Sequence, residues 1–145
     1  MLYEMIALLC AALFAGASIH VSIVEHPARM SAGLGVALAQ FRPGYRRAAV
    51  MQSVLAILGF AASLAAYASG RGWPALVGGL FLILVAPWTL IVLMPTNRQL
   101  LDVARAAETP GTESLLRRWG MLHAVRTVMS FVSLTIFATH LGMYP

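Results

Sequence analysis

The stretch of residues 73–95, WPALVGGLFLILVAPWTLIVLMP, contains no charged side chain and decides the class of fold. At ~1.5 Å rise per residue, a helix of this length crosses a hydrocarbon core about 30 Å thick. We therefore expect a membrane-spanning helix over residues 74–94. Pro87 removes one backbone hydrogen bond, so it should kink this helix, and a neighbour such as Thr89 or a water would satisfy the freed carbonyl.

Three more apolar stretches of similar length lie on either side of this one. With it, they predict spans at about residues 5–26, 48–67, 74–94 and 119–141. Pro27 should end the first span at His26, because the residue before a proline avoids helical geometry. The chain is 60% hydrophobic and 10% charged, too few charges for the surface of a soluble domain. The sequence thus predicts an all-α integral membrane protein: one domain, residues 1–145, folded as a four-transmembrane-helix bundle.

The connections between spans carry weaker signals. Residues 27–45 contain enough apolar side chains to lie on the membrane surface or to pack against the bundle. The segment PTNRQLLDVARAAE, residues 95–108, predicts a short amphipathic helix in the third connection, with Thr96 or Asn97 as its N-cap. The sequence TPGT at residues 109–112 should break that helix, and Thr112 is the expected N-cap of the last one. No basic residue precedes the first apolar run but Glu4 does, so we expect a retained helix rather than a secretory leader.

The ten basic residues are all arginines, and their distribution predicts the orientation. The arginines of the two long connections are Arg29, Arg42, Arg46, Arg47, Arg98, Arg105, Arg117 and Arg118. The middle connection has only Arg71, and neither terminus has any. The positive-inside rule places both long connections in the cytoplasm and both termini outside, with Tyr67, Trp73 and Tyr144 at the outer interface. A bacterial inner membrane is the expected location.

Other classes of function are disfavoured by the same composition. No basic run with interleaved aromatics indicates nucleic-acid binding. The single cysteine, Cys10, excludes a disulfide framework and a CxxC site. Membrane lipid and a small apolar ligand are the expected partners. The Ala- and Gly-rich faces of the first two spans would allow close helix packing and a homo-oligomer.

The scarce polar residues converge at the predicted cytoplasmic ends of the spans. They are Glu25, His26, Gln52, Asn97, Arg98, His123 and Arg126. His123 and Arg126 are three residues apart and share one helix face, which Thr127 continues. An arginine at the depth of Arg126 either snorkels to the headgroups or points into a polar interior, where it marks a functional site.

Plainer interpretations of the same residues stay open at this point. His26 suits a histidine that caps helix carbonyls, Glu25 a solvated charge and Asn97 a helix cap. His20 is expected to be a packed histidine, and His140 belongs near the opposite membrane face. Glu25, His26 and His123 could together hold a metal ion, although no spacing demands one and no zinc, nucleotide or nucleophile-elbow motif is present.

Three segments resemble signatures of a known family. They are SIVEHPARM (22–30), PWTLIVLMPTNRQL (87–100) and RRWGMLHAVRTVMS (117–130). They are similar to segments of the DUF1772 family of membrane proteins, which includes the anthrone oxygenases of polyketide pathways. The resemblance implies a monooxygenase that converts an anthrone, or a similar activated phenolic methylene, to a quinone with dioxygen and without flavin, haem or nicotinamide.

The positions that match the family's motifs suggest roles for individual residues. His123 or His26 would take the methylene proton, and Arg126, helped by Asn97 or Arg98, would stabilise the resulting oxyanion. Trp119 and Arg98, which match the motifs, are expected to bind the substrate. Gln52 and Thr127 are expected to do so because they belong to the same polar end of the bundle. Two other functions remain open: a redox enzyme with a metal ion or haem held by His26 and His123, and a non-catalytic accessory protein that binds lipid or a partner.

Overall fold

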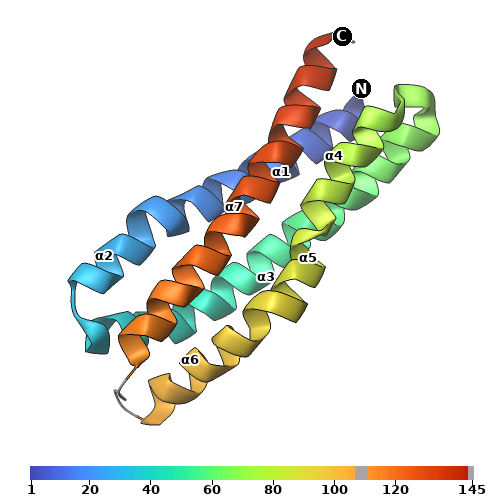
Figure 1. The fold of residues 1–145 in the computed structure, drawn as a ribbon. Helices are drawn as coiled ribbons and strands as arrows, with labels where there is room; N and C mark the ends of the chain where they lie inside the picture. Colours follow the sequence, from blue (N-terminus) through green and yellow to red (C-terminus); the bar gives the residue numbers. More distant parts are fainter. Residues whose placement is uncertain (107–110, 144–145) are drawn as a thin grey trace.

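The computed structural model describes residues 1–106 and 111–143, and the regular elements in these two ranges are all helices. Four helical rods, Leu2–Ser31, Leu34–Arg71, Trp73–Val103 and Thr112–Met143, are each long and apolar enough to cross a membrane. Both termini lie at one end of the bundle (Figure 1). The predicted all-α, four-helix integral membrane architecture is therefore confirmed.

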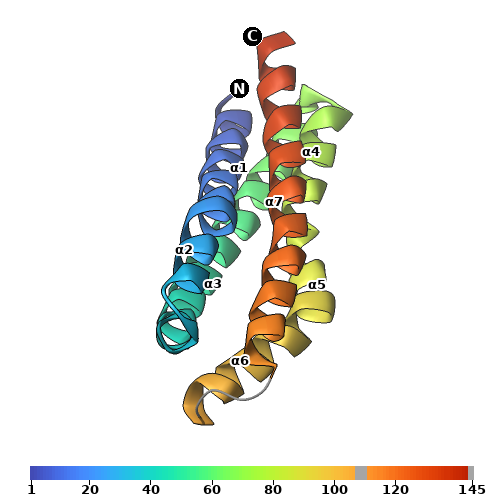
Figure 2. The ribbon, with the colours of Figure 1, turned by 60° about the vertical axis from the view of Figure 1, so that its left-hand side comes forward.

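The rods form a ring in which each packs against two neighbours. Its order is α1 (Leu2–His20), α3 (Leu34–Ala66), α4 (Trp73–Ile83) and α7 (Thr112–Met143), which returns to α1. Figure 2 shows α7 running between α1 and α4. We call the end opposite the termini the arginine-rich end, and its cytoplasmic location stays a prediction.

The sequence predicted that the first rod ends at His26, but the rod continues beyond this residue. A π-helical turn, η1 (Val21–Glu25), leads directly into α2 (His26–Ser31). The His26 N–H donates to the Val21 carbonyl, five residues back. Pro27 then falls in the first turn of α2, where a missing N–H costs little. The helix therefore passes the proline and reaches Ser31.

A π-helical turn also lets the third rod continue past Pro95. The rod breaks at Leu84, continues as α5 (Val85–Trp88) and then as a second π-helical turn, η3 (Thr89–Leu93). The Met94 N–H donates to the Thr89 carbonyl, and α6 (Met94–Ala106) follows without interruption. The amphipathic helix exists as expected, but Thr96 and Asn97 lie inside it, so the N-cap assignment was wrong.

Pro87 lies three residues beyond the break at Leu84, in agreement with the expected kink. The Thr89 hydroxyl donates to the Val85 carbonyl at 2.7 Å. This hydroxyl does not donate to the Ile83 carbonyl, which would have accepted a hydrogen bond from the N–H that Pro87 lacks.

The second rod begins earlier than expected, at Leu34 rather than near Ala48, and contains Pro43. Residues 34–45 thus pack against the bundle and bury Ala37, Leu38 and Phe41. At the other end of this rod, η2 (Tyr67–Arg71) is a turn rather than a true helix, since Gly70 has φ +82°. Gly72 has φ +83°, and the two glycines reverse the chain so that α3 and α4 are antiparallel neighbours, as predicted.

Small residues let these two helices approach closely. A Cβ on Gly79 would lie 1.8 Å from Ser63 Oγ, and one on Gly59 would lie 2.5 Å from Leu82 Cδ2. This agrees with the predicted role of small residues in packing.

A homo-oligomer stays a prediction. The expected break at residues 109–110, the side chain of Arg105 and Tyr144 lie outside the described residues.

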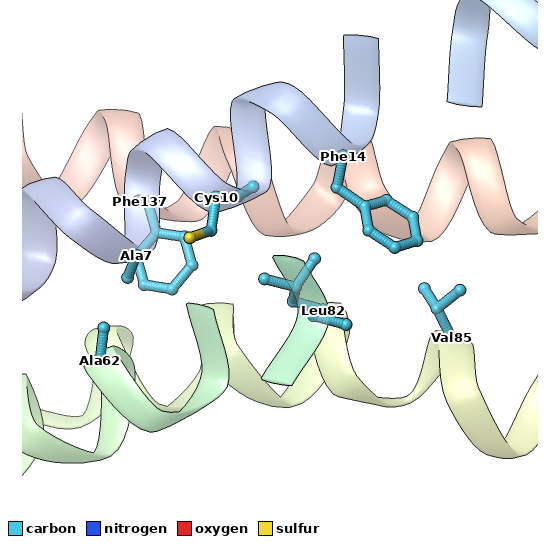
Figure 3. Packing of buried hydrophobic residues seen from close by; sticks show 9 residues of the cluster. Ala7, Cys10, Phe14, Ala62, Leu82, Val85 and Phe137 are labelled. Carbon is cyan, nitrogen blue, oxygen red and sulfur yellow. The ribbon is translucent and has the colours of Figure 1, made fainter. Parts of the chain in front are cut away.

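Two separate groups of buried apolar side chains hold the bundle together. The first core lies toward the termini and includes Phe14, Leu82, Val85 and Phe137 from four different elements (Figure 3). The second core lies at the arginine-rich end and consists of Ala37, Leu38, Phe41, Leu93, Leu100, Leu116 and Trp119. The candidate site lies between them.

Candidate active site

A cavity of about 270 Å³ separates the two cores. Phe14, Ala56 and Val85 of the first core line one end of the cavity, and Phe41, Leu93 and Trp119 of the second core line the other. Both π-helical turns contribute to its wall, through residues of η1 and of η3. Such turns occur frequently at functional sites, because they shift side chains from their regular helical positions.

The wall of the cavity carries more positive than negative formal charge. Its ionisable or hydrogen-bonding side chains are Glu25, Arg29, Tyr45, Gln52, Ser53, Thr89, Trp119, His123 and Arg126. Glu25 is the one carboxylate in this set and Arg29 and Arg126 are the two guanidinium groups. The cavity therefore suits a ligand that carries, or develops, negative charge.

Arg126 extends from α7 into the interior of the bundle. One terminal nitrogen donates to Gln52 Oε1 on α3 at 2.6 Å, and Arg126 Cζ lies 5.8 Å from the centre of the Phe14 ring. Arg126 Nε and Gln52 Nε2 are buried without a partner among the described residues. Of the two alternatives left open by the sequence, snorkelling and an interior position, the structure shows the interior one.

His123 is 3% exposed and is held by hydroxyl groups on one edge of its ring. Its Nδ1 lies 3.1 Å from Ser22 Oγ, which lies 2.9 Å from Thr127 Oγ1. Thr127 in turn donates to the Ser18 carbonyl at 3.2 Å. Within residues 1–106 and 111–143, His123 Nε2 has no hydrogen-bond partner, so this nitrogen remains available to a ligand.

Trp119 forms the wall of the cavity beside His123. The two rings are stacked, with centroids 4.9 Å apart and planes at 29°. Phe41 meets the indole edge to face at 5.3 Å. Trp119 Nε1 donates to Asn97 Oδ1 at 2.8 Å, and Asn97 is fully buried. Asn97 therefore fixes the orientation of the indole.

The structure brings some of the predicted site residues together and separates others. Those that line the cavity are Glu25, Gln52, Trp119, His123 and Arg126. His26, Asn97, Arg98 and Thr127 do not line it. Arg98 is exposed on α6, whereas Asn97 and Thr127 contact residues of the wall. The His26 ring packs 5.2 Å from Trp119 and against Gly120, where a Cβ would lie 2.5 Å from His26 Nε2.

Arg29 lines the cavity, although its place in the sequence suggested only a connection arginine. Arg29 is 6% exposed, is paired with Glu25, and lies over the rings of Phe41 and Trp119 at 5.9 and 5.4 Å. The four-residue spacing between Glu25 and Arg29 was a usable signal. It was overlooked because the helix was expected to stop at His26. Ser22 and Tyr45 were missed as well.

Glu25 is more than a solvated charge, since it pairs with Arg29 and accepts a hydrogen bond from Gln40 at 2.7 Å. In the described part of the chain, no group of three or more His, Cys, Asp or Glu side chains is placed to hold a metal ion. Glu25, His26 and His123, which the sequence left open as a possible metal site, thus do not form such a group. Whether the protein uses a cofactor stays a matter of prediction.

Comparisons with known proteins agree with the resemblance of the sequence segments. The anthrone oxygenase of Aspergillus fumigatus named tpcL is 33% identical to the chain over 75 residues, which are 50% of this chain and 47% of that protein. The chain thus spans about half the length of this relative. No solved structure matches it. The sequence profile of the anthrone oxygenase family matches residues 41–136, which include Asn97, His123 and Arg126 but begin after His26. The chain belongs to the anthrone oxygenase family.

Proposed function

We propose that the protein is a membrane-embedded oxygenase that oxidises a small apolar phenolic substrate, of the anthrone type, with dioxygen. The observation that carries this proposal is the meeting of His123 with the Arg126–Gln52 pair in one buried cavity. Membership of the anthrone oxygenase family supports the reaction class.

The overall reaction balances without a further reductant. One anthrone and one dioxygen give one quinone and one water. Loss of a proton from the methylene carbon leaves a carbanion whose charge is shared with the ring carbonyl oxygen. Electron transfer from this carbanion to dioxygen and formation of a C–O bond give a hydroperoxide. Loss of the second methylene hydrogen as a proton, with cleavage of the O–O bond, releases water and leaves the new carbonyl.

His123 is the base in this scheme. A neutral imidazole can accept a proton from an acidic methylene carbon. Nδ1 is occupied by Ser22 Oγ. In the tautomer in which Nδ1–H donates to that hydroxyl, Nε2 carries the lone pair that accepts the proton. The same nitrogen then returns the proton to the peroxide.

Arg126 stabilises the oxyanion that forms when the proton leaves. Its guanidinium lies at the cavity wall and is oriented by Gln52 Oε1. Donors fixed in advance in a water-poor site are worth more than the same donors in water, because they need no reorganisation. The indole of Trp119, stacked on His123, offers a flat surface for an aromatic ring.

The test is oxygen uptake by the purified protein in lipid nanodiscs supplied with anthrone. Wild type should consume one dioxygen per quinone formed, above the rate of protein-free nanodiscs. His123→Ala should lower the rate by about 10²-fold or more, the usual contribution of a general base. His20→Ala is the matched control and should be unchanged, since His20, which was expected to be packed, is an exposed histidine of α1.

Two results would count against the proposal. Normal turnover by a folded His123→Ala variant would remove this histidine from the mechanism. Absence of quinone formation by wild type, with the fold intact, would leave a non-catalytic accessory role as the better account.

A further inference from the structure

The cavity lies between the two cores and reaches the side of the bundle. The first and second cores fill the space above and below it with buried apolar side chains. Three of its lining residues, Ser53, Ala86 and Leu90, are nevertheless exposed. Leu90 is 64% exposed, more than a residue facing only an internal space would be. The opening therefore lies between α3 and the α5–η3 stretch.

Packing of the third rod explains why an opening forms there. α3 packs closely against α4 and against α6, but much less against the α5–η3 stretch between them. This stretch follows the break at Leu84 and contains both Pro87 and the π-helical turn. Such features bend a helix away from its neighbour. The facing residues Ala49 and Ala86 are too small to fill the resulting gap.

The surroundings of the opening are apolar. Val54 on α3 is 49% exposed and Ile91 on η3 is 73% exposed, and neither lines the cavity. Ser53 lies six residues beyond Arg47, which is ~9 Å along a helix. If Arg47 marks the interface, as its charge suggests, the opening faces the hydrocarbon of the bilayer rather than water.

We propose that this opening is a lateral portal through which a flat apolar aromatic molecule passes between the bilayer and the cavity. The portal is bounded by Ala49 and Ser53 on α3 and by Ala86 and Leu90 on α5–η3. The proposal builds on the proposed function, because it names the route and the class of substrate: molecules that dissolve in lipid are admitted, and charged, water-soluble relatives are not.

The experiment follows anthracene into the cavity by its quenching of Trp119 fluorescence in nanodiscs. The Trp119→Phe variant supplies the signal of the other two of the three tryptophans. Ser53→Phe and Ala86→Phe narrow the portal. Val54→Phe and Ile91→Phe add the same ring to lipid-facing neighbours that do not line the cavity. Anthracene-2-sulfonate serves as the charged probe with the same ring system.

Each portal variant should slow quenching by about tenfold, equivalent to a barrier raised by about 1.4 kcal/mol, while the two neighbours stay within about twofold of wild type. Anthracene-2-sulfonate should quench far more slowly than anthracene. Equal rates in portal and neighbour variants would overturn the portal, and so would equal rates for the two probes. Absence of quenching in wild type would overturn it too.

Failure of the portal and failure of the proposed function give different results. If anthracene enters at a rate that the portal variants slow, but wild type forms no quinone from anthrone, the oxygenase proposal fails and the portal stands. If quinone forms at the same rate in the portal variants and their neighbours, the enzyme stands and the portal fails.

Discussion

The two halves of the bundle bury the same three kinds of ionisable side chain in different ways. Near the termini, Glu4 is 2% exposed and pairs with Arg71, and its Oε1 lies 3.1 Å from His140 Nε2. The terminal amino group lies 3.6 Å from the same carboxylate. In this terminal cluster of Glu4, Arg71 and His140, the basic groups surround one acid and fasten α1, the α3–α4 turn and α7 together.

The cavity contains the same three kinds of ionisable side chain, but they are incompletely paired there. Glu25 pairs with Arg29, whereas no carboxylate among the described residues pairs with Arg126. Buried nitrogens of Arg29, Gln52 and Arg126 also lack hydrogen-bond partners among the described residues, whereas the buried atom of the terminal cluster that lacks one, Glu4 Oε1, lies within ion-pair distance of His140. Unpaired buried polar groups are costly, and in membranes they mark sites of function. The contrast indicates that open donors around a space, rather than burial of charge alone, distinguish a site from a structural cluster.

Arg126→Gln is the variant expected to have the largest effect on the rate of quinone formation. Removing the guanidinium should lower the rate of quinone formation by about 10²- to 10³-fold, as for loss of an oxyanion-stabilising donor. Oxygen uptake in nanodiscs measures this loss. Arg118→Gln, which changes an exposed arginine of the same helix, is the control. Comparable losses in both variants would show that charge in general, and not this position, matters.

A smaller loss, about tenfold, is expected for Asn97→Ala, because Asn97 acts on the site through the indole of Trp119. A double-mutant cycle with Trp119→Phe separates this role from direct catalysis. If Asn97 only positions the indole, Asn97→Ala should change the rate little in the Trp119→Phe background. An undiminished tenfold loss there would assign Asn97 a direct role.

His26→Ala should reduce turnover less again, by under about fivefold, because His26 supports Trp119 and does not line the cavity. The rate of quinone formation is to be compared with that of His123→Ala under the same conditions. A loss as large as that of His123→Ala would mean that both histidines take part in proton transfer.

The smallest effect on turnover belongs to the terminal cluster. Glu4→Gln should leave turnover per folded molecule unchanged but lower the free energy of unfolding by about 3 kcal/mol, the lower end of what breaking a buried ion pair costs. The lower end applies because the Arg71 side chain is 24% exposed. Denaturation in detergent measures the change, and Glu113→Gln, in an exposed pair with Arg117, should shift it by only about 0.5 kcal/mol. A loss of turnover in folded Glu4→Gln would erase the distinction between the two ends.

Hydropathy alone predicted the class of fold, because an uninterrupted apolar run has few alternatives to a spanning helix. The ends of the helices were harder to predict. Pro27 was interpreted as a stop, and the third span was expected to end at residue 94, just before Pro95, yet each helix passes its proline by way of a π-helical turn. A π-helical hydrogen bond, from an N–H to the carbonyl five residues earlier, leaves no local signature in the sequence. The continuation of the first rod to Ser31 and of the third rod to Ala106 could therefore not be foreseen.

The site was partly predictable, because the spacing of residues along one helix can be read from the sequence. His123 and Arg126 lie three residues apart on one helix, a spacing that fixes their common face without knowledge of the tertiary fold. The contacts of Arg29 with Phe41 and Trp119, and the pairing of Asn97 with Trp119, depend on how separate rods pack. Arg98 was grouped with the site because it follows Asn97 in a motif of the family, yet it is exposed. Such cross-helix relations are set by tertiary packing, which sequence spacing does not contain.

The most direct test of the whole account is an experimental structure of the protein in nanodiscs with the quinone product, anthraquinone. We expect planar density between the two cores, with one product oxygen about 3 Å from the Arg126 guanidinium, at hydrogen-bond distance, and the ring system beside His123. A product bound elsewhere, with Arg126 turned toward the headgroups and the cavity filled by side chains, would contradict the account.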